Sequence, residues 1–285
     1  MNFADKLFAT LKSIAKIALG SRPVAGGKGD KGTIVIMGNG PSLADTIRTD
    51  RRLLEVYPTL AVNFAAIAPE FAELRPEYYV LADPHFFRDS AEGNLERLRS
   101  CLAVVNWPMT LFVPRAMRAR AARLYANPNI TLQVFNFVGA EGFGWFEKAV
   151  YSARLAMPRP RNVLVPSIIV AIAEGFSKII IVGADHSWMK TIWVTAENEV
   201  VSVQPHFYND SKAEENRIRH DYRNIKLHQV VESFAIAFKS YHSIANFAAS
   251  KGVCILNATP DSFIDAFERR SAQKLLADYE NSILH

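Results

Sequence analysis

The most constraining feature of this sequence is an apolar run at residues 34–37 that leads directly into a Gly-Asn-Gly turn at 38–40. Such a run, without polar alternation, is typical of a strand buried on both faces, as in a parallel sheet covered by helices. Glycines at the end of a strand let the backbone bend sharply and approach a ligand closely. Pro41 and Ser42 favour a helix start, with Ser42 either capping the helix or facing a ligand. Because the amides of a helix start attract anions, the turn predicts a phosphate site.

Polar residues also follow other predicted strands. Asn63, Asp83 and Asp185 each end or follow a short apolar run. Ligands of doubly wound sheets bind at the carboxyl ends of the strands, so we expect these residues and the glycine turn to share one cleft. The turn matches neither G-x-G-x-x-G nor G-x-x-x-x-G-K-[ST], so a tight turn without a ligand is the alternative. For Asp83 the alternative is a helix cap ahead of Pro84.

The rest of the chain alternates helical and strand patterns, which indicates an α/β architecture. Further strands are predicted at residues 60–63, 78–82, 102–105, 110–113, 130–135, 178–182 and 253–256. Helices are predicted at residues 43–57, 66–74, 117–125, 168–174 and 227–250, from residue 145, and after Pro260 to about residue 280. Over residues 33–285 this order predicts a three-layer, Rossmann-like α/β domain with a mostly parallel sheet and helices on both faces.

Composition excludes some function classes. The 285 residues suffice for one large domain, and the net charge of +5 suits a polyanionic ligand or a membrane surface but is too small to indicate nucleic-acid binding. Cys101 and Cys254, the two cysteines, lie in apolar runs and are predicted to be buried thiols. Because they cannot build a disulfide framework or a zinc site, a cytoplasmic location is expected.

Residues 1–19 form a separate unit, an amphipathic helix whose apolar residues recur at helical spacing between lysines. They are too few and too charged to span a bilayer. The helix is expected either to pack on the domain or on a partner chain, which leaves a homo-oligomer open, or to lie on anionic lipid at the inner membrane face. Residues 20–32 are predicted to be a flexible linker.

Residues 189–225 lack periodicity and are rich in histidine, tyrosine and charged residues. A long insertion of this kind is commonly a lid over a site. Its densest cluster contains His206 and Tyr208, and His220 lies further along. A surface histidine without function is the alternative for His206.

The order of these motifs resembles two known families. Gly-Asn-Gly-Pro-Ser-Leu at 38–43 resembles the opening of the bacterial sialyltransferases of the Campylobacter lipooligosaccharide type (glycosyltransferase family 42) and of the related MptE-like proteins, the 6-hydroxymethylpterin pyrophosphokinase group. Asn63 followed by Asp-Pro-His-Phe-Phe at 83–87 matches the sialyltransferase order, with Asp83 where that family has asparagine and the MptE-like proteins have aspartate. The stretch 171–185, which ends in Gly-Ala-Asp, resembles the central signature of both families.

The sialyltransferase resemblance implies transfer of a sugar from a CMP-linked donor to a cell-surface glycan acceptor, without a metal or other cofactor. It implies nucleotide contacts from Gly38, Asn39, Gly40, Ser42, Asn63, Asp83, Ser167 and Asp185. It also implies that His206 is the catalytic acid or base and that Tyr208 stabilises the leaving group, with His220 as the alternative histidine.

The MptE-like resemblance implies a different chemistry. Asp83 and Asp185 would hold magnesium against a triphosphate in a pyrophosphokinase. A third hypothesis is a non-catalytic, nucleotide-binding scaffold attached to a membrane through residues 1–19.

Overall fold

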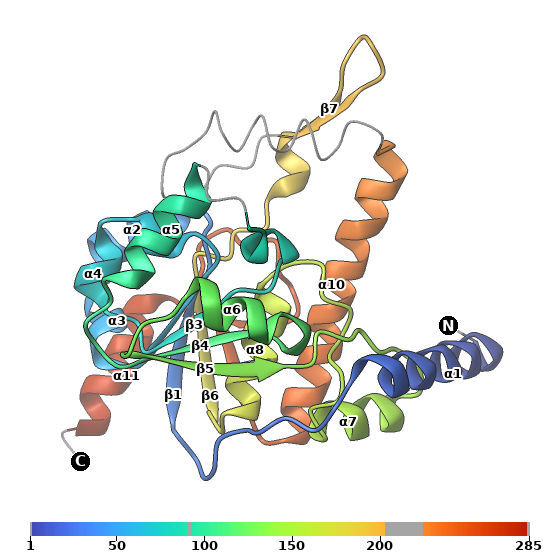
Figure 1. The fold of residues 1–285 in the computed structure, drawn as a ribbon, viewed down its shortest axis with the longest axis horizontal. Coiled ribbons are helices and arrows are strands. Elements are labelled where there is room, and N and C mark those ends of the chain that lie inside the picture. The colour runs from blue at the N-terminus through green and yellow to red at the C-terminus, as the bar shows by residue number, and fades with distance from the viewer. Residues whose placement is uncertain (1, 90–92, 203–224, 284–285) are drawn as a thin grey trace.

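The computed structural model describes residues 2–89, 93–202 and 225–283. In this part of the chain, eight parallel strands form one sheet in the order β10-β9-β6-β1-β2-β3-β4-β5 (Figure 1). Its strands are β1 (Thr33–Met37), β2 (Thr59–Val62), β3 (Tyr78–Val80), β4 (Met109–Pro114), β5 (Ile130–Phe135), β6 (Lys178–Val182), β9 (Cys254–Asn257) and β10 (Glu268–Arg269). A separate antiparallel pair consists of β7 (Ile192–Val194) and β8 (Val200–Ser202).

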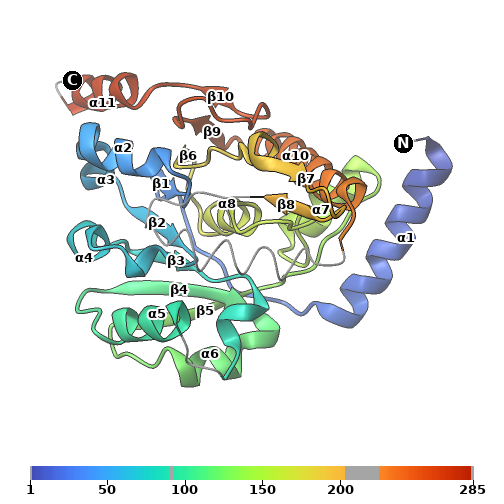
Figure 2. The same ribbon diagram turned by 90° about the horizontal axis from the view of Figure 1, so that it is seen from above.

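Helices cover both faces of the sheet and make the fold three-layered (Figure 2). One face packs against α7 (Gly144–Ser152), α8 (Leu164–Ala173) and α10 (Leu227–Ser250). The other face packs against α2 (Ser42–Thr49), α3 (Arg52–Val56), α4 (Glu70–Leu74), α5 (Asn94–Ala103), α6 (Arg118–Leu124) and α11 (Ala272–Ile283), with the 3₁₀ turns η1 (Ala65–Ile67), η2 (Pro84–Phe87) and η3 (Arg115–Met117). Apolar side chains of β1 alternate between the two cores, because Ile34 and Ile36 face the first and Val35 and Met37 the second.

The predicted fold class is confirmed, since the strands form a parallel sheet between two helical layers. Four predicted elements were wrong. Residues 102–105 are not a strand, because they belong to the end of α5 and the turn after it. The helix expected at 43–57 is broken into α2 and α3 at Asp50, and the one expected at 66–74 is broken into η1 and α4 at Ala68. The last helix begins at Ala272 rather than soon after Pro260.

The thiol of Cys254 was predicted to be buried, and this prediction was wrong. Cys254 is exposed and Cys101 is half-buried. Cys254 is the first residue of β9, where the strand has not yet entered the core, although the next three residues are buried. A short apolar run therefore does not show which of its ends is covered.

The N-terminal helix α1 (Phe3–Gly20) lies at the periphery of the molecule, beside α7 (Figures 1 and 2). Residues 21–32 then run along the domain to β1. Ser21 Oγ donates to Leu155 O at 2.5 Å, and Asn136 Nδ2 donates to Arg22 O at 2.7 Å, so the start of this linker is attached to the domain. No helix in the described ranges is long and apolar enough to cross a membrane.

The direction of the chain changes at β1, in the middle of the sheet. From β1 the chain proceeds to β2, β3, β4 and β5 on one side, and only then returns to β6 on the other side of β1. The connection after β1 leads to α2 in one helical layer, whereas the connection after β6 leads to α10 in the other. A crevice is expected outside the carboxyl ends of β1 and β6, where these connections diverge.

Candidate functional site

A cleft of about 400 Å³ occupies this crevice. Its volume is within the range typical of small-ligand sites. The turns after β1, β2, β3 and β6 and the segment before α8 supply its walls. The cleft brings together six of the residues that the sequence predicts for one site: Gly38, Asn39, Gly40, Asn63, Asp83 and Asp185.

The two glycines of the first turn serve the contact between β1 and β6. The amide of Gly38 donates to Val182 O and that of Gly40 to Gly183 O, both at 2.8 Å. A Cβ atom on Gly38 would lie 2.4 Å from Gly183 O, and one on Gly40 would lie 2.7 Å from the same oxygen. Glycine is therefore required at both positions because two backbone turns meet here, and both residues also line the cleft, so their predicted contact with a ligand stays a prediction.

A carboxylate already lies at the start of α2. Asp185 Oδ2 accepts from Ser42 Oγ at 2.8 Å and is 3.4 Å from the Ser42 amide nitrogen. This oxygen occupies the position where an anion is favoured by the helix dipole. Pro41 is the N-cap and Ser42 makes no capping bond, so the structure does not show the first of the two roles predicted for Ser42, and its hydroxyl binds Asp185 instead. The geometry at α2 therefore supports Asp185, and not a phosphate, as the partner of this helix start.

Two side-chain amides in the cleft have buried atoms without a hydrogen-bond partner among the described residues. These atoms are Asn63 Oδ1, an acceptor, and Asn162 Nδ2, a donor. Asn63 has a left-handed backbone with φ of 51°, and its carbonyl accepts from the Tyr79 hydroxyl at 2.6 Å. Asn162 Oδ1 accepts from the Leu164 amide at 3.0 Å, which fixes the orientation of the side chain at the start of α8. Because buried polar atoms are rarely left unpaired, both atoms require a partner from outside the chain, either an ordered water or a ligand.

His186 extends this polar group toward α10. Its Nε2 lies 2.6 Å from the hydroxyl of Tyr241, and that hydroxyl donates to Asn162 Oδ1 at 3.0 Å. The Trp188 ring packs on the imidazole with 4.3 Å between ring centroids. Burial lowers the pKa of His186 to about 3, and burial also raises the pKa of the fully buried Tyr241. His186 is therefore neutral at pH 7 and acts here as a fixed hydrogen-bonding group.

The remaining predicted residues have different positions. Asp83 lines the cleft, but its Oδ1 also accepts from the His85 amide at 2.7 Å and so caps η2, as the alternative interpretation proposed. Ser167 is fully buried in α8, where its hydroxyl donates to Val163 O at 2.8 Å, so the structure does not bring it to the cleft. His206, Tyr208 and His220 lie outside the described residues.

Sequence reasoning missed three lining residues of the cleft, Arg161, Asn162 and His186, and also Tyr241, which contacts Asn162 and His186 from behind. His186 had a local signal, because it directly follows Asp185 at the end of a predicted strand. Arg161 and Asn162 precede a helix and carry no such signal. Tyr241 lies 55 residues beyond His186 in the middle of α10, and only the packing of that helix brings it to the site.

The charged residues that line the cleft in the described part of the chain are one arginine and two aspartates. Arg161 is exposed and is the only lysine or arginine among the lining residues in the described part of the chain. Asp83 and Asp185 are the two carboxylates on the same lining. The described residues contain no group of three or more histidine, cysteine, aspartate or glutamate side chains placed to hold a metal ion.

Comparison with known proteins gives a structural likeness. No protein-family profile matches the chain, and no curated protein matches its sequence. Among solved structures, the fold is similar to that of the MAf glycosyltransferase from Magnetospirillum magneticum AMB-1, with a TM-score of 0.52 and 12% sequence identity. The likeness covers 96% of this chain and 39% of that protein, so the chain spans about two-fifths of its length. At this identity the comparison establishes a shared fold.

Proposed function

We propose that this chain is a glycosyltransferase that binds a nucleotide sugar in the cleft between β1 and β6. The observation that carries the proposal is the pair of buried, unpartnered amide atoms, Asn63 Oδ1 and Asn162 Nδ2, on the walls of that cleft. One accepts and the other donates, which suits the base and ribose of a nucleotide. The fold shared with a glycosyltransferase supports the same class of reaction.

The sugar donor that we propose is CMP-linked, by the sialyltransferase resemblance of the strand-end motifs, and the acceptor is a cell-surface glycan. Arg161 is placed to bind the donor's anionic group, because it supplies positive charge at the rim of the cleft. Asp185 is a positioning residue, since its bond to Ser42 holds the turn after β6 against the turn after β1.

The chemical step needs a group that transfers a proton between acceptor and leaving phosphate. His186 does not suit this role, because a pKa of about 3 leaves it a weak base. We therefore propose that His206 transfers the proton and that Tyr208 stabilises the leaving phosphate. His206→Ala should lower transfer from a CMP-sugar by about 10²–10⁴-fold while CMP affinity stays nearly unchanged. Chelation of divalent metal should leave the rate of transfer unchanged.

Binding can be tested by thermal shift with CMP, a CMP-sugar, ATP and GTP, each with and without magnesium. A ligand that binds the folded chain raises the melting temperature by mass action. We expect CMP and the CMP-sugar to do so without magnesium. Arg161→Gln should weaken binding by roughly tenfold or more, because it removes a charge-assisted hydrogen bond. Arg120→Gln is the matched control, since Arg120 is an exposed arginine on α6 outside the cleft.

A second candidate is the magnesium-dependent pyrophosphokinase, favoured by the two carboxylates on one cleft. The residues fit a metal only in part, because Asp185 Oδ2 and Asp83 Oδ1 already accept hydrogen bonds. The other oxygens could hold magnesium only together with the phosphates of the substrate. A shift with ATP or GTP that needs magnesium, combined with loss of turnover in Asp83→Asn, would replace the glycosyltransferase proposal. A shift with a nucleotide but no turnover would leave the nucleotide-binding scaffold, and no shift with any nucleotide would contradict all three hypotheses.

A further inference from the structure

Helix α1 is docked on the domain by a narrow side that contains Thr10, Ser13 and Ile17, of which Ile17 packs against one core of the sheet. Its buried residues are Thr10 and Ser13, whereas six large apolar side chains point to solvent: Phe3, Leu7, Phe8, Leu11, Ile14 and Leu19 are between 44% and 84% exposed. An amphipathic surface helix usually turns its apolar stripe toward the core. Here the orientation is reversed.

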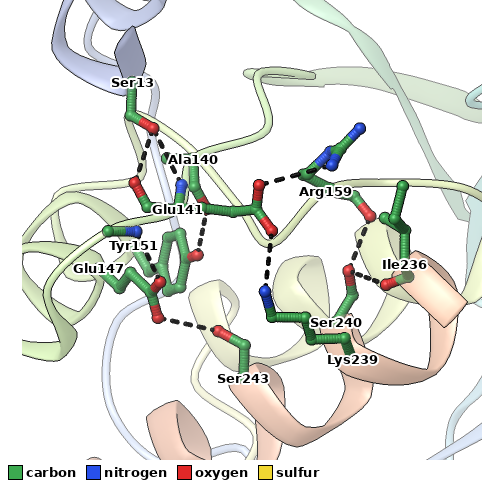
Figure 3. Close-up of polar contacts among 11 residues, drawn as sticks. Ser13, Ala140, Glu141, Glu147, Tyr151, Arg159, Ile236, Lys239, Ser240 and Ser243 are labelled. Carbon is green, nitrogen blue, oxygen red and sulfur yellow. Dashed lines mark hydrogen bonds and ion pairs between the residues drawn. The ribbon is translucent and has the colours of Figure 1, made fainter. Parts of the chain in front are cut away.

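The reversed orientation is held by specific hydrogen bonds (Figure 3). Ser13 Oγ donates to Glu141 O at 2.8 Å and accepts from the Glu141 amide at 2.9 Å. Thr10 Oγ1 accepts from the Phe143 amide at 3.1 Å. The segment that receives α1 is itself fixed, because Glu147 Oε1 accepts from the Gly142 amide at 2.9 Å and Ser243 donates to the other carboxylate oxygen at 3.2 Å.

The contact between α1 and this segment is also close. A Cβ atom on Gly142 would lie 2.1 Å from Thr10 Oγ1. The carboxylate of Glu141 in the same segment forms two ion pairs (Figure 3). Its Oε1 lies 3.7 Å from Lys239 Nζ of α10, and its Oε2 lies 3.6 Å from Arg159 Nη1. These close contacts of Thr10 and Ser13 with residues 141–143 fix the rotation of α1 on the domain and so leave its apolar side exposed.

The exposed side is a broad and uncharged arc. At about 100° per residue, positions 3, 14, 7, 18, 11, 4, 15, 8 and 19 follow one another around the helix and span about 160°. All nine are phenylalanine, leucine, isoleucine or alanine. We call this surface the apolar arc. Lys12 and Lys16 border it on one side, with Asp5 between them around the helix, and all three are exposed.

Aromatic residues of the domain continue the apolar arc. The Phe3 ring packs on Phe143 with 5.4 Å between centroids, and Phe143 stacks on Trp145 at 6.5 Å. Trp145 is 70% exposed at the start of α7. An exposed tryptophan beside an apolar helix is typical of the boundary between lipid headgroups and acyl chains.

We propose that the apolar arc and Trp145 bind the surface of an anionic lipid bilayer, with α1 lying in the plane of the interface. Charge complementarity favours lipid over a second copy of the chain, because α1 carries three lysines and one aspartate, and Lys12 and Lys16 beside the arc would meet lipid phosphates. The width of the arc agrees, since helices that pair with a second helix use a narrower apolar seam. This surface is independent of the nucleotide site.

The test is co-sedimentation of the full chain with vesicles of phosphatidylcholine and phosphatidylglycerol in equal parts, and with vesicles of phosphatidylcholine alone. We expect strong binding to the anionic vesicles, weakened by salt and by Lys12→Gln with Lys16→Gln. Leu7→Gln with Leu11→Gln should lower the partition by about tenfold or more for each leucine removed from the membrane.

A matched control exists on α10, where Leu227 and Val231 have the same spacing and are 40% and 47% exposed. Leu227→Gln with Val231→Gln should leave vesicle binding unchanged. Equal losses in the two pairs, or no binding to anionic vesicles, would overturn the proposal. A dimer in sedimentation equilibrium without lipid that is lost in Leu7→Gln with Leu11→Gln would also overturn it, in favour of a second copy as the occupant.

Discussion

The cleft and the apolar arc of α1 are built in opposite ways. In the cleft, polar atoms of Asn63 and Asn162 remain without partners in the described residues, within walls that the sheet and α8 hold in place. On α1, the hydroxyls of Thr10 and Ser13 hydrogen-bond to the backbone of residues 141–143, and the six large apolar side chains of the arc remain exposed. Unpaired buried polar atoms call for a hydrogen-bonding ligand, and uncovered apolar surface calls for an apolar partner. The two regions therefore indicate different kinds of partner.

The first prediction tests whether the wall of the cleft is as closely packed as the structure shows. Gly40→Ala should lower the free energy of unfolding by about 1–3 kcal/mol, because the new Cβ meets a backbone oxygen that cannot rotate away. The Cβ would lie 2.7 Å from Gly183 O and 1.9 Å from Asp185 Oδ2, so the carboxylate must also move. Urea unfolding measures the effect. Gly144→Ala is the control, since its Cβ would meet nothing within 4 Å, and equal losses in both variants would contradict the packing.

The second prediction concerns the charge state of the cleft. Burial lowers the pKa of His186 from 6.5 to about 3, so between these pH values the unfolded chain binds a proton that the folded chain does not. The contribution of His186 to the free energy of unfolding should be fully present above about pH 6.5. It should fall as the pH decreases toward 3, by at most about 1.4 kcal/mol per pH unit. His186→Gln should flatten the dependence of the unfolding free energy on pH between about 4 and 6. His228→Gln, at an exposed position, should not, and parallel curves for wild type and His186→Gln would show that the imidazole is not held neutral.

The third prediction tests the attachment of α1. Ser13→Ala removes two hydrogen bonds to the backbone of Glu141 and should weaken docking by about 1 kcal/mol. Hydrogen exchange of the amides in α1 should become about fivefold faster, while the exchange of the sheet stays unchanged. Ser152→Ala on the exposed end of α7 is the control. Unchanged exchange in α1 would show that contacts other than this serine hold the helix.

Much of the fold was predictable because strand and helix patterns are local. The strand at 178–182, the strand at 130–135 and the helix at 227–250 have the bounds that the sequence indicates. The ends of strands also placed Asn63, Asp83 and Asp185 on one cleft, since carboxyl ends of parallel strands share an edge. The pattern failed at 102–105, where four residues give too little periodicity to separate a strand from the end of a helix.

The sequence by itself determined the α/β class and most strands of the parallel sheet, the edge of the sheet at which Asn63, Asp83 and Asp185 gather, and the apolar character of one side of α1. Tertiary structure decided which partner each polar group has. Ser42 meets Asp185 across 143 residues of chain, and Ser13 meets Glu141 across 128. These contacts decide that Asp185 occupies the start of α2 and that Thr10 and Ser13 of α1 face the domain. Periodicity marks the faces of an element, but the surface that each face meets depends on the packing of distant segments.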